Sequence, residues 1–364
     1  RMPVTKQSRT APDAISAAPT GSAGVLPDKF DSVEQLDDFL AQPSQSLIDD
    51  LAEVDGDILI LGVAGKMGPT LARLARNAAP DKKITGVARF SEPGLREDLE
   101  RAGIETIKAD LLDADQVNAL PRTRNVIFMA GMKFGASGNQ PQTWAMNVHC
   151  PSIVASTFHE SRIVAFSTGN IYPLVNVMHQ GSTETSPTGP RGEYAQSCLG
   201  RERMFEYFSK RHETPGRLIR LNYAIDLRYG VLYDLASRIK AGTPIDLSLM
   251  GHVNVIWQGD ANAQTLRSLR HCTTPASPLN VSGPETLSVR WLAEELAARL
   301  DTRAKLEGTE SETAWLTNSA EATRLFGYPS VPLSVMLDWV ANWVAHERPS
   351  FNKPTKFEVR DGDF

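Results

Sequence analysis

The chain has 364 residues, of which 41% are hydrophobic and 22% are charged, and its formal net charge is −5. This composition is typical of globular proteins and excludes disorder of the whole chain, and the mildly acidic charge excludes an electrostatic footprint for nucleic acid or an anionic membrane. Every apolar run is shorter than the roughly 18 residues that span a bilayer, and the N-terminus has no apolar signal core, so we expect a cytoplasmic protein.

The N-terminal part divides into two segments. Residues 1–27 are rich in Ala, Ser, Thr, Pro and Gly, and we expect a mobile tail because they bury too little apolar surface to offset the entropy cost of ordering. Residues 28–55 carry apolar side chains at helical spacing on both sides of Pro43. This pattern predicts an N-terminal helical extension of two short amphipathic helices that pack on the main domain or on a partner subunit.

From residue 56 the sequence alternates buried strands with helix-length segments. The predicted strands are residues 57–63, 83–89, 104–108, 125–130, 162–167 and 217–221, with prominent helices over 142–159 and 194–211. Strands separated in this way predict βαβ units and a parallel sheet covered on both faces. The predicted fold class is therefore α/β, with a doubly wound sheet of the Rossmann type.

We expect this dinucleotide-binding Rossmann domain to span residues 56–225, with segments near 250–265 returning to it. Residues 226–348 are predicted to form a smaller α/β region that binds substrate. Residues 349–364 are assigned to a C-terminal tail.

The first predicted strand runs into a glycine loop, Gly62-Val-Ala-Gly65-Lys66-Met67-Gly68, and then into a helix. The spacing G-x-x-G-x-x-G at this position is typical of a tight turn whose backbone lies close to a pyrophosphate at a helix N-terminus. The loop therefore predicts a dinucleotide site.

The end of the second strand bears on the choice of dinucleotide. NAD-binding folds usually carry an Asp or Glu there for the ribose hydroxyls, whereas this strand ends in Arg89. Arg89 can hold a 2′-phosphate in a charge-assisted pair, with Lys66 as a second cation. We therefore favour NADP, with NAD as the second choice; the alternative is that both charges are merely solvated.

Metal binding is not predicted. The cysteines Cys150, Cys198 and Cys272 form no CxxC pair, and the seven histidines show no HExxH spacing. These spacings favour a reducing compartment and argue against a disulfide framework or a metal site.

Further motifs follow in order along the chain. They are Ala109-Asp110-Leu111-Leu-Asp113, Ala130-Gly131, Asn147 within a helix, Phe166-Ser-Thr168-Gly-Asn170-Ile-Tyr172, Tyr194, and Arg220-Leu-Asn222-Tyr223-Ala224. Together with the glycine loop they resemble the extended short-chain dehydrogenase/reductase family, often labelled NAD-dependent epimerase/dehydratase. The resemblance covers roughly residues 57–345 and includes Leu279–Gly283, which resembles an element of the family's smaller substrate domain.

The resemblance implies specific roles. Tyr194 takes the position of the catalytic tyrosine, and Thr168 that of the catalytic Ser/Thr. The residues implied to bind the cofactor are Gly62, Gly65, Lys66, Met67, Gly68, Arg89, Asp110, Leu111, Ala130, Gly131, Lys133, Asn147, Tyr194 and Asn222. Those implied to bind substrate, a sugar or sugar derivative, are Asn170, Asn222 and Tyr223. The resemblance also implies a homodimer formed through helices 142–159 and 194–211.

One motif departs from the family. Its tyrosine motif is Tyr-x-x-x-Lys, but here Cys198 follows Tyr194 at the fourth position. A cation near a phenol lowers the pKa of that phenol by about 1–3 units, which a neutral thiol cannot do. Lys133 is our first candidate for a replacement cation, and Arg201, on the same helical face as Tyr194, is the second.

Two alternatives to a replacement cation stay open: Cys198 has a chemical role of its own, or the site binds cofactor without hydride transfer.

The simplest interpretation of the stretch Arg201-Glu202-Arg203 is a solvated helix face. Because Gly169-Asn170 follows Thr168, where the family's sugar dehydratases carry Asp-Glu, elimination chemistry is disfavoured. We expect an NADP(H)-dependent oxidoreductase or epimerase with Tyr194, Thr168 and Lys133 as catalytic residues; the alternative is a catalytically silent sensor or scaffold.

Overall fold

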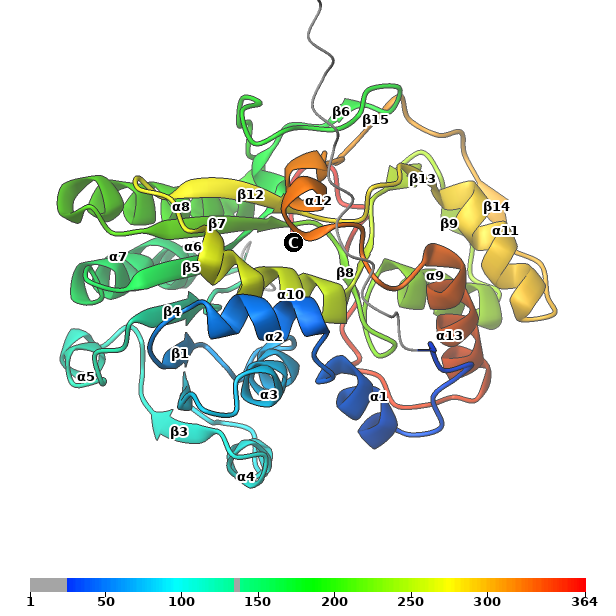
Figure 1. The fold of residues 1–364 in the computed structure, drawn as a ribbon. Coiled ribbons are helices and arrows are strands. Elements are labelled where there is room, and N and C mark those ends of the chain that lie inside the picture. Colours follow the sequence, from blue (N-terminus) through cyan, green and yellow to red (C-terminus); the bar gives the residue numbers. More distant parts are fainter. Residues whose placement is uncertain (1–24, 134–137) are drawn as a thin grey trace, which may run out of the picture.

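The computed structural model describes residues 25–133 and 138–364. Its central strands are β1 (Ile58–Leu61), β2 (Ile84–Ala88), β3 (Glu105–Lys108), β4 (Asn125–Phe128), β5 (Arg162–Thr168), β7 (Gly216–Leu221) and β12 (Ser277–Val281). They form one parallel sheet in the order β12-β7-β5-β4-β1-β2-β3 (Figure 1). The predicted α/β fold with a Rossmann-type parallel sheet is confirmed. Most of the predicted N-terminal tail, residues 1–24, lies outside the described residues.

Helices cover both faces of this sheet because its strands are apolar on both sides. In β1, Ile58 and Ile60 face one layer, and Leu59 and Leu61 face the other. The first layer contains α3 (Gly68–Ala78), α4 (Leu95–Arg101), α10 (Gln258–Arg267) and α12 (Ala320–Phe326). The second contains α5 (Ala114–Asn118), α7 (Cys150–Thr157) and α8 (Gly192–His212), with α6 (Gln140–Trp144) and a π-helical turn (Ala145–His149) before α7. Among the described helices, none has the length and apolar character needed to cross a membrane.

The position of the seventh strand, β12, corrects one expectation. From the sequence, Leu279–Gly283 is expected in the smaller substrate domain, but β12 belongs to the main sheet. β12 pairs in parallel with β7, and Leu279 lies opposite Ile219. Both side chains are buried in the same layer as α10 and α12. The main sheet therefore includes a strand that begins about 50 residues after residue 225. The edge of the sheet at β7 has apolar side chains and backbone groups that need hydrogen-bond partners, and β12 supplies both apolar packing and backbone partners there.

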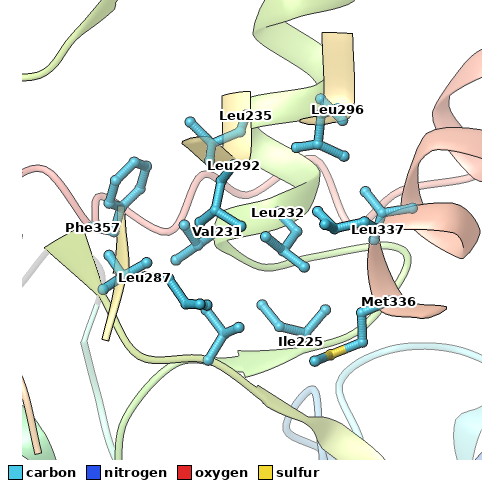
Figure 2. Packing of buried hydrophobic residues seen from close by; sticks show 14 of the residues in the cluster. Ile225, Val231, Leu232, Leu235, Leu287, Leu292, Leu296, Met336, Leu337 and Phe357 are labelled. Atoms are coloured by element: carbon cyan, nitrogen blue, oxygen red, sulfur yellow. The ribbon is translucent and has the colours of Figure 1, made fainter. Parts of the chain in front are cut away.

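A second core lies among α9 (Val231–Ala241), α11 (Val289–Arg299) and α13 (Leu333–Ala345). Figure 2 shows side chains such as Leu235, Leu292 and Leu337 converging between these helices. The remaining short strands are β6 (Val175–Asn176), β8 (Ala224–Ile225), β9 (Ile245–Asp246), β10 (His252–Val253), β11 (Ile256–Trp257), β13 (Leu287–Ser288), β14 (Leu306–Glu307) and β15 (Thr313–Ala314). The 3₁₀ turn Gly169–Ile171 follows β5, and the 3₁₀ turn Ser268–His271 follows α10 and packs in the first helix layer of the main sheet.

The N-terminal extension consists of α1 (Val33–Leu40) and α2 (Gln45–Ala52). Each helix begins at a serine, Ser32 or Ser44, whose hydroxyl accepts a hydrogen bond from a backbone N–H in the first turn. On α2, Asp50 is only 5% exposed and pairs with Arg267 of α10. The extension thus packs on the main domain, beside α3 and α10 (Figure 1).

The C-terminal segment, residues 349–364, runs back across the smaller region. Phe357 and Phe364 are 1% and 2% exposed and belong to the second core. Glu358 pairs with Arg238 of α9, and the Arg360 Nη2 donates to Thr313 Oγ1 at 2.6 Å. Apolar burial and ion pairs therefore order this segment against the domain.

Candidate active site

A cleft of about 760 Å³ lies at the carboxyl ends of β1, β4, β5 and β7. Between β1 and β4 the strand order reverses, which is where open α/β sheets form a crevice for ligands. The cleft is lined by the glycine loop, the loop after β4, the end of β5, α8, the residues after β7 and the C-terminal segment.

The glycine loop is shaped by close packing on one side and open space on the other. A Cβ on Gly62, whose φ is +88°, would lie 2.6 Å from the Ala130 N, and a Cβ on Gly68 would lie 2.0 Å from the Val63 O. On Gly65 a Cβ would meet only the Gly62 O, at 3.7 Å, so the missing side chain leaves that part of the loop open. The loop lies at the N-terminus of α3, and its shape fits a dinucleotide pyrophosphate.

Tyr194 and Thr168 meet in this cleft. Tyr194 lies in the first turn of α8, and Thr168 is the last residue of β5. Burial raises the pKa of the Tyr194 phenol well above its ordinary value, while a hydrogen bond with Thr168 lowers it. The thiol of Cys198 lies one helical turn further along the same face of α8, and burial raises its pKa as well. The residue at the fourth position after Tyr194 is therefore a neutral thiol and not a positive charge.

Arg201 is a buried cation in the lining of the cleft that contains Tyr194 and Thr168. Its side chain lines the cleft, with Nη1 donating to the Phe166 O at 2.9 Å and Nη2 to the Asn147 Oδ1 at 2.7 Å. Asn147 also accepts from Met132 N and donates to Met132 O. This set of hydrogen bonds joins α8 to the loop after β4 and to the end of β5.

The expectation that Arg201, Glu202 and Arg203 form a solvated helix face is wrong for the first two. Arg201 is 6% exposed and Glu202 is fully buried, whereas Arg203 is exposed and pairs with Glu206. Glu202 is bound instead by Arg220 of β7, at 2.8 Å. The side of α8 that carries Arg201 and Glu202 packs along the sheet, so these two charged side chains are buried together with the groups that they bind.

Lys133 lies over the aromatic ring of Tyr194. Its Nζ is 5.6 Å from the centroid of the Tyr194 ring and 4.5 Å from that of Phe364, and it lies 3.4 Å from the Thr355 O. Burial and the charge of Lys66 lower the pKa of Lys133 to about 8. The C-terminal segment thus encloses the candidate catalytic tyrosine together with a lysine.

Cations gather at the glycine-loop end of the cleft. The Nζ of Lys66 lies 4.0 Å from the centroid of the Tyr229 ring, and Lys353 of the C-terminal segment lines the same cleft. Burial and the charge of Lys353 lower the pKa of Lys66 to about 8. Arg228 pairs at 2.9 Å with Asp37 of α1, so the N-terminal extension and the C-terminal segment both reach this end. Such a lining suits the phosphates of a dinucleotide.

Most of the residues singled out in the sequence meet in the cleft. Those that line it are Gly62, Gly65, Lys66, Met67, Gly68, Gly131, Lys133, Thr168, Asn170, Tyr194, Asn222 and Tyr223. Tyr223 adopts a left-handed backbone conformation, with φ at +49°, which is unusual for an aromatic residue.

Five predicted residues lie outside the lining of the cleft among the described residues. Arg89 is exposed just beyond β2, and the Asp110 carboxylate caps the turn after β3 by accepting from Leu112 N. Leu111 and Ala130 are buried in the layer that contains α7. Asn147 is buried behind the cleft, where it holds Arg201.

Sequence reasoning missed the contribution of the C-terminal segment. Phe351, Lys353 and Thr355 all line the cleft. They come from the stretch Phe351-Asn-Lys-Pro-Thr-Lys-Phe357, whose interleaved aromatic and basic residues are a signal that a tail assignment overlooks. Arg228 and Tyr229 were also missed, although they closely follow the predicted sixth strand.

Several solved structures share this fold. UDP-glucuronic acid 4-epimerase from Bacillus cereus, solved with UDP-glucuronic acid and NAD, is 17% identical with a TM-score of 0.68, and the match covers 80% of this chain and 99% of that chain. dTDP-glucose 4,6-dehydratase from Bacillus anthracis, solved with NAD, is 13% identical with a TM-score of 0.68, and the match covers 79% of this chain and 96% of that chain. Pal from Bacillus thuringiensis is 15% identical with a TM-score of 0.66, and the match covers 80% of this chain and 100% of that chain. At these identities the likeness establishes the fold.

The family follows from sequence. No curated protein matches the chain. The model of the NAD dependent epimerase/dehydratase family matches residues 58–249, which is more than half of the chain and includes the glycine loop, Thr168 and Tyr194. This protein therefore belongs to the NAD-dependent epimerase/dehydratase family of enzymes.

Proposed function

We propose that this enzyme is an NADP(H)-dependent oxidoreductase or epimerase that acts on a hydroxyl or keto carbon of a sugar or sugar derivative. The observation that carries the proposal is that Tyr194 and Thr168 line the same cleft as the glycine loop, with Thr168 close enough to lower the pKa of the phenol. A bound nicotinamide cofactor would supply hydride transfer at the substrate carbon.

The chain's own residues supply the proton chemistry and the orientation of substrate. Tyr194 gives a proton to, or takes it from, the substrate oxygen as that oxygen changes between hydroxyl and carbonyl. Thr168, which lines the cleft beside the phenol, orients the same oxygen. Asn170 and Tyr223 line the cleft beside them and are the candidate substrate contacts. Lys133, across the Tyr194 ring, is retained as a third catalytic candidate.

For the cofactor, the glycine loop would hold the pyrophosphate and Lys66 would add a positive charge beside it. The solved structures of the Bacillus cereus and Bacillus anthracis enzymes contain NAD. For this chain we favour NADP, because Arg89 and not an acidic residue follows β2, and its exposed guanidinium is accessible to a phosphate.

The substrate class rests on the family and on what its structural neighbours bind. The Bacillus cereus enzyme was solved with UDP-glucuronic acid. A sugar or sugar derivative is the corresponding proposal here. We further propose a cytoplasmic homodimer formed through α6–α8, where Trp144 and Tyr207 are exposed aromatic side chains on the outer surface.

Turnover with a panel of sugar lactones, uronates, keto-sugars and nucleotide sugars tests the proposal. Wild-type protein is expected to turn over at least one of them with NADP(H) or NAD(H), and Tyr194→Phe is expected to lose about 10²-fold or more of that rate, since a positioned acid–base contributes that much. Tyr328→Phe, at an exposed tyrosine outside the lining of the cleft, is the matched control and should retain wild-type turnover. Equal turnover by the Tyr194→Phe variant would contradict the assignment of the acid–base.

A second function is favoured by one observation, the neutral thiol of Cys198 beside Tyr194. In that case the chain is a silent sensor or scaffold that binds a nicotinamide dinucleotide without transferring hydride. Tight dinucleotide binding with no turnover across the whole panel would support this alternative.

A further inference from the structure

We propose that Arg201 is the permanent positive charge of this active site and stabilises the phenolate form of Tyr194 during proton transfer. The proposal rests on the proposed function, in which Tyr194 is the acid–base. Arg201 acts through Tyr194 and is therefore a positioning residue, not a catalytic one.

The first argument is that Arg201 is a buried charge whose hydrogen-bond acceptors are neutral. The side chain is 6% exposed, and its two Nη atoms donate to a backbone carbonyl and to the Asn147 amide. Over residues 25–133 and 138–364 its Nε has no acceptor and no carboxylate pairs with it. The adjacent Glu202 is engaged by Arg220 instead. A buried charge without a counter-charge destabilises a fold, so its presence in the lining of a cleft points to a function.

The second argument is its position relative to Tyr194. Both residues are on α8 and line the same cleft, two helical turns or about 10 Å apart along the axis. Cys198 lies between them on that face. Burial raises the pKa of Tyr194 and of Cys198, and in both cases the charge of Arg201 acts in the opposite direction. The guanidinium thus favours the phenolate at a position where burial disfavours it.

The third argument is that the guanidinium is held in place. A Cβ on Gly131 would lie 2.4 Å from Arg201 Nη2 and 3.1 Å from Asn147 Oδ1. The small-residue turn after β4 is therefore required by Arg201 as well as by any ligand. With Asn147 tied to both Met132 backbone groups, the charge is preorganised before substrate arrives.

The competing cation is Lys133. It lies over the Tyr194 ring, with Lys66, Lys356 and Asp234 as its charged neighbours. With a pKa of about 8, caused by burial and then by Lys66, its ammonium loses charge in mildly alkaline solution. A guanidinium stays charged throughout this range. Arg201 is therefore the permanent charge, and Lys133 a titrating one.

The test measures the proton affinity of residue 194 without a substrate. A fluorinated tyrosine at position 194 of the full chain, more acidic than tyrosine, is titrated by ¹⁹F NMR in five backgrounds: unchanged, Arg201→Met, Arg201→Lys, Lys133→Met and Arg203→Met. Arg201→Met is expected to raise the titration midpoint by about 1 pH unit, the effect of one unit charge about 10 Å away at an effective dielectric constant of about 20. Arg201→Lys should recover part of the shift, which loss of packing alone would not explain.

Arg203→Met is the matched control, because it removes the same charge from the exposed side of α8 and should move the midpoint by less than about 0.3 units. The proposal is overturned if a folded Arg201→Met protein has the same titration midpoint as the unchanged background. It is also overturned if Lys133→Met shifts the midpoint more than Arg201→Met does. If Arg201→Met does not fold, Arg201→Gln is used, since it keeps a polar amide at about the place of the arginine Nε without the charge. Failure of the proposed function is recognised separately, as unimpaired turnover in Tyr194→Phe.

Discussion

At the scale of single residues, the proton on Tyr194 is controlled by burial and charge acting in opposite directions. Burial raises the pKa of the phenol, and Arg201 and Thr168 lower it. Burial is the largest of these effects, so the pKa of the phenol lies above its ordinary value and burial favours the protonated form.

Arg89 allows a prediction about the cofactor. Its guanidinium is exposed beyond β2, where a 2′-phosphate could reach it. Titration with both dinucleotides is expected to show tighter binding of NADPH than of NADH, and Arg89→Ala is expected to abolish the difference by weakening NADPH alone. Arg96→Ala, an exposed arginine of α4 paired with Glu100, is the control and should keep the preference. Equal affinities in the wild-type protein would reverse the assignment.

At the same scale, sequence and structure contributed different information about the site. Gly62, Thr168 and Tyr194 were predictable because each belongs to a motif of short sequence range. The burial of Arg201 was not predictable, since a charged residue on a helix is normally solvated and only the packing of α8 on the sheet encloses it. The neutral character of Cys198 follows from the same packing.

At the scale of elements, the N-terminal extension is attached to the domain by a buried ion cluster. Asp50 of α2 is bound by Arg267 at the end of α10 and by Arg270 just after it. Helical periodicity predicted two helices before the first strand, and the structure has them as α1 and α2. Periodicity did not predict their docking site, because the partner arginines lie more than 200 residues away.

Asp50→Ala is expected to lower the free energy of unfolding by about 3 kcal/mol, since it leaves the guanidinium of Arg267 without its carboxylate in a partly buried position. Asp49→Ala removes an exposed carboxylate from the same helix and should change stability by less than about 0.5 kcal/mol. Urea denaturation of both variants measures the difference. Equal effects would show that the cluster does not hold α2 to the domain.

The same pair predicts a pH dependence. Burial raises the pKa of Asp50, but hydrogen bonds from Arg267 and Arg270 outweigh burial, and the net pKa is below the ordinary value. A carboxyl with a lowered pKa in the folded state stabilises the protein above its unfolded pKa of about 4 and loses that effect as the pH falls through the folded value. The stability gap between wild type and Asp50→Ala should therefore narrow below about pH 4. A gap that is constant down to about pH 2 would contradict this dependence.

At the scale of the whole molecule, segments from both ends of the described chain meet at one cleft. Asp37 of α1 and Lys353 of the C-terminal segment line it together with the glycine loop. One fifth of the chain lies outside the match to the Bacillus cereus enzyme, whereas nearly all of that enzyme is matched. This chain therefore carries additions to a shared fold, and its terminal segments contribute to the site.

The C-terminal segment gives a prediction that separates stability from activity. The Phe364 ring stands edge-on to that of Tyr194, with centroids 5.4 Å apart, and Phe357 is buried in the same core. Phe364→Ala and Phe357→Ala should each lower the free energy of unfolding by about 3–5 kcal/mol. Only Phe364→Ala is expected to change kcat and KM beyond what the loss of folded protein explains. Identical kinetics in the two folded variants would exclude a role for Phe364 in shaping the site.

The sequence by itself predicted six strands of the main sheet, the two helices of the N-terminal extension, the glycine loop and the resemblance to the family, because periodicity and short motifs depend on neighbouring residues. Only the tertiary structure decided that β12 completes the sheet, that the C-terminal segment lines the cleft, and that Arg201 lies buried near Tyr194. These features depend on contacts between residues far apart in the chain. Burial and electrostatic environment arise from such contacts, and no local pattern encodes them.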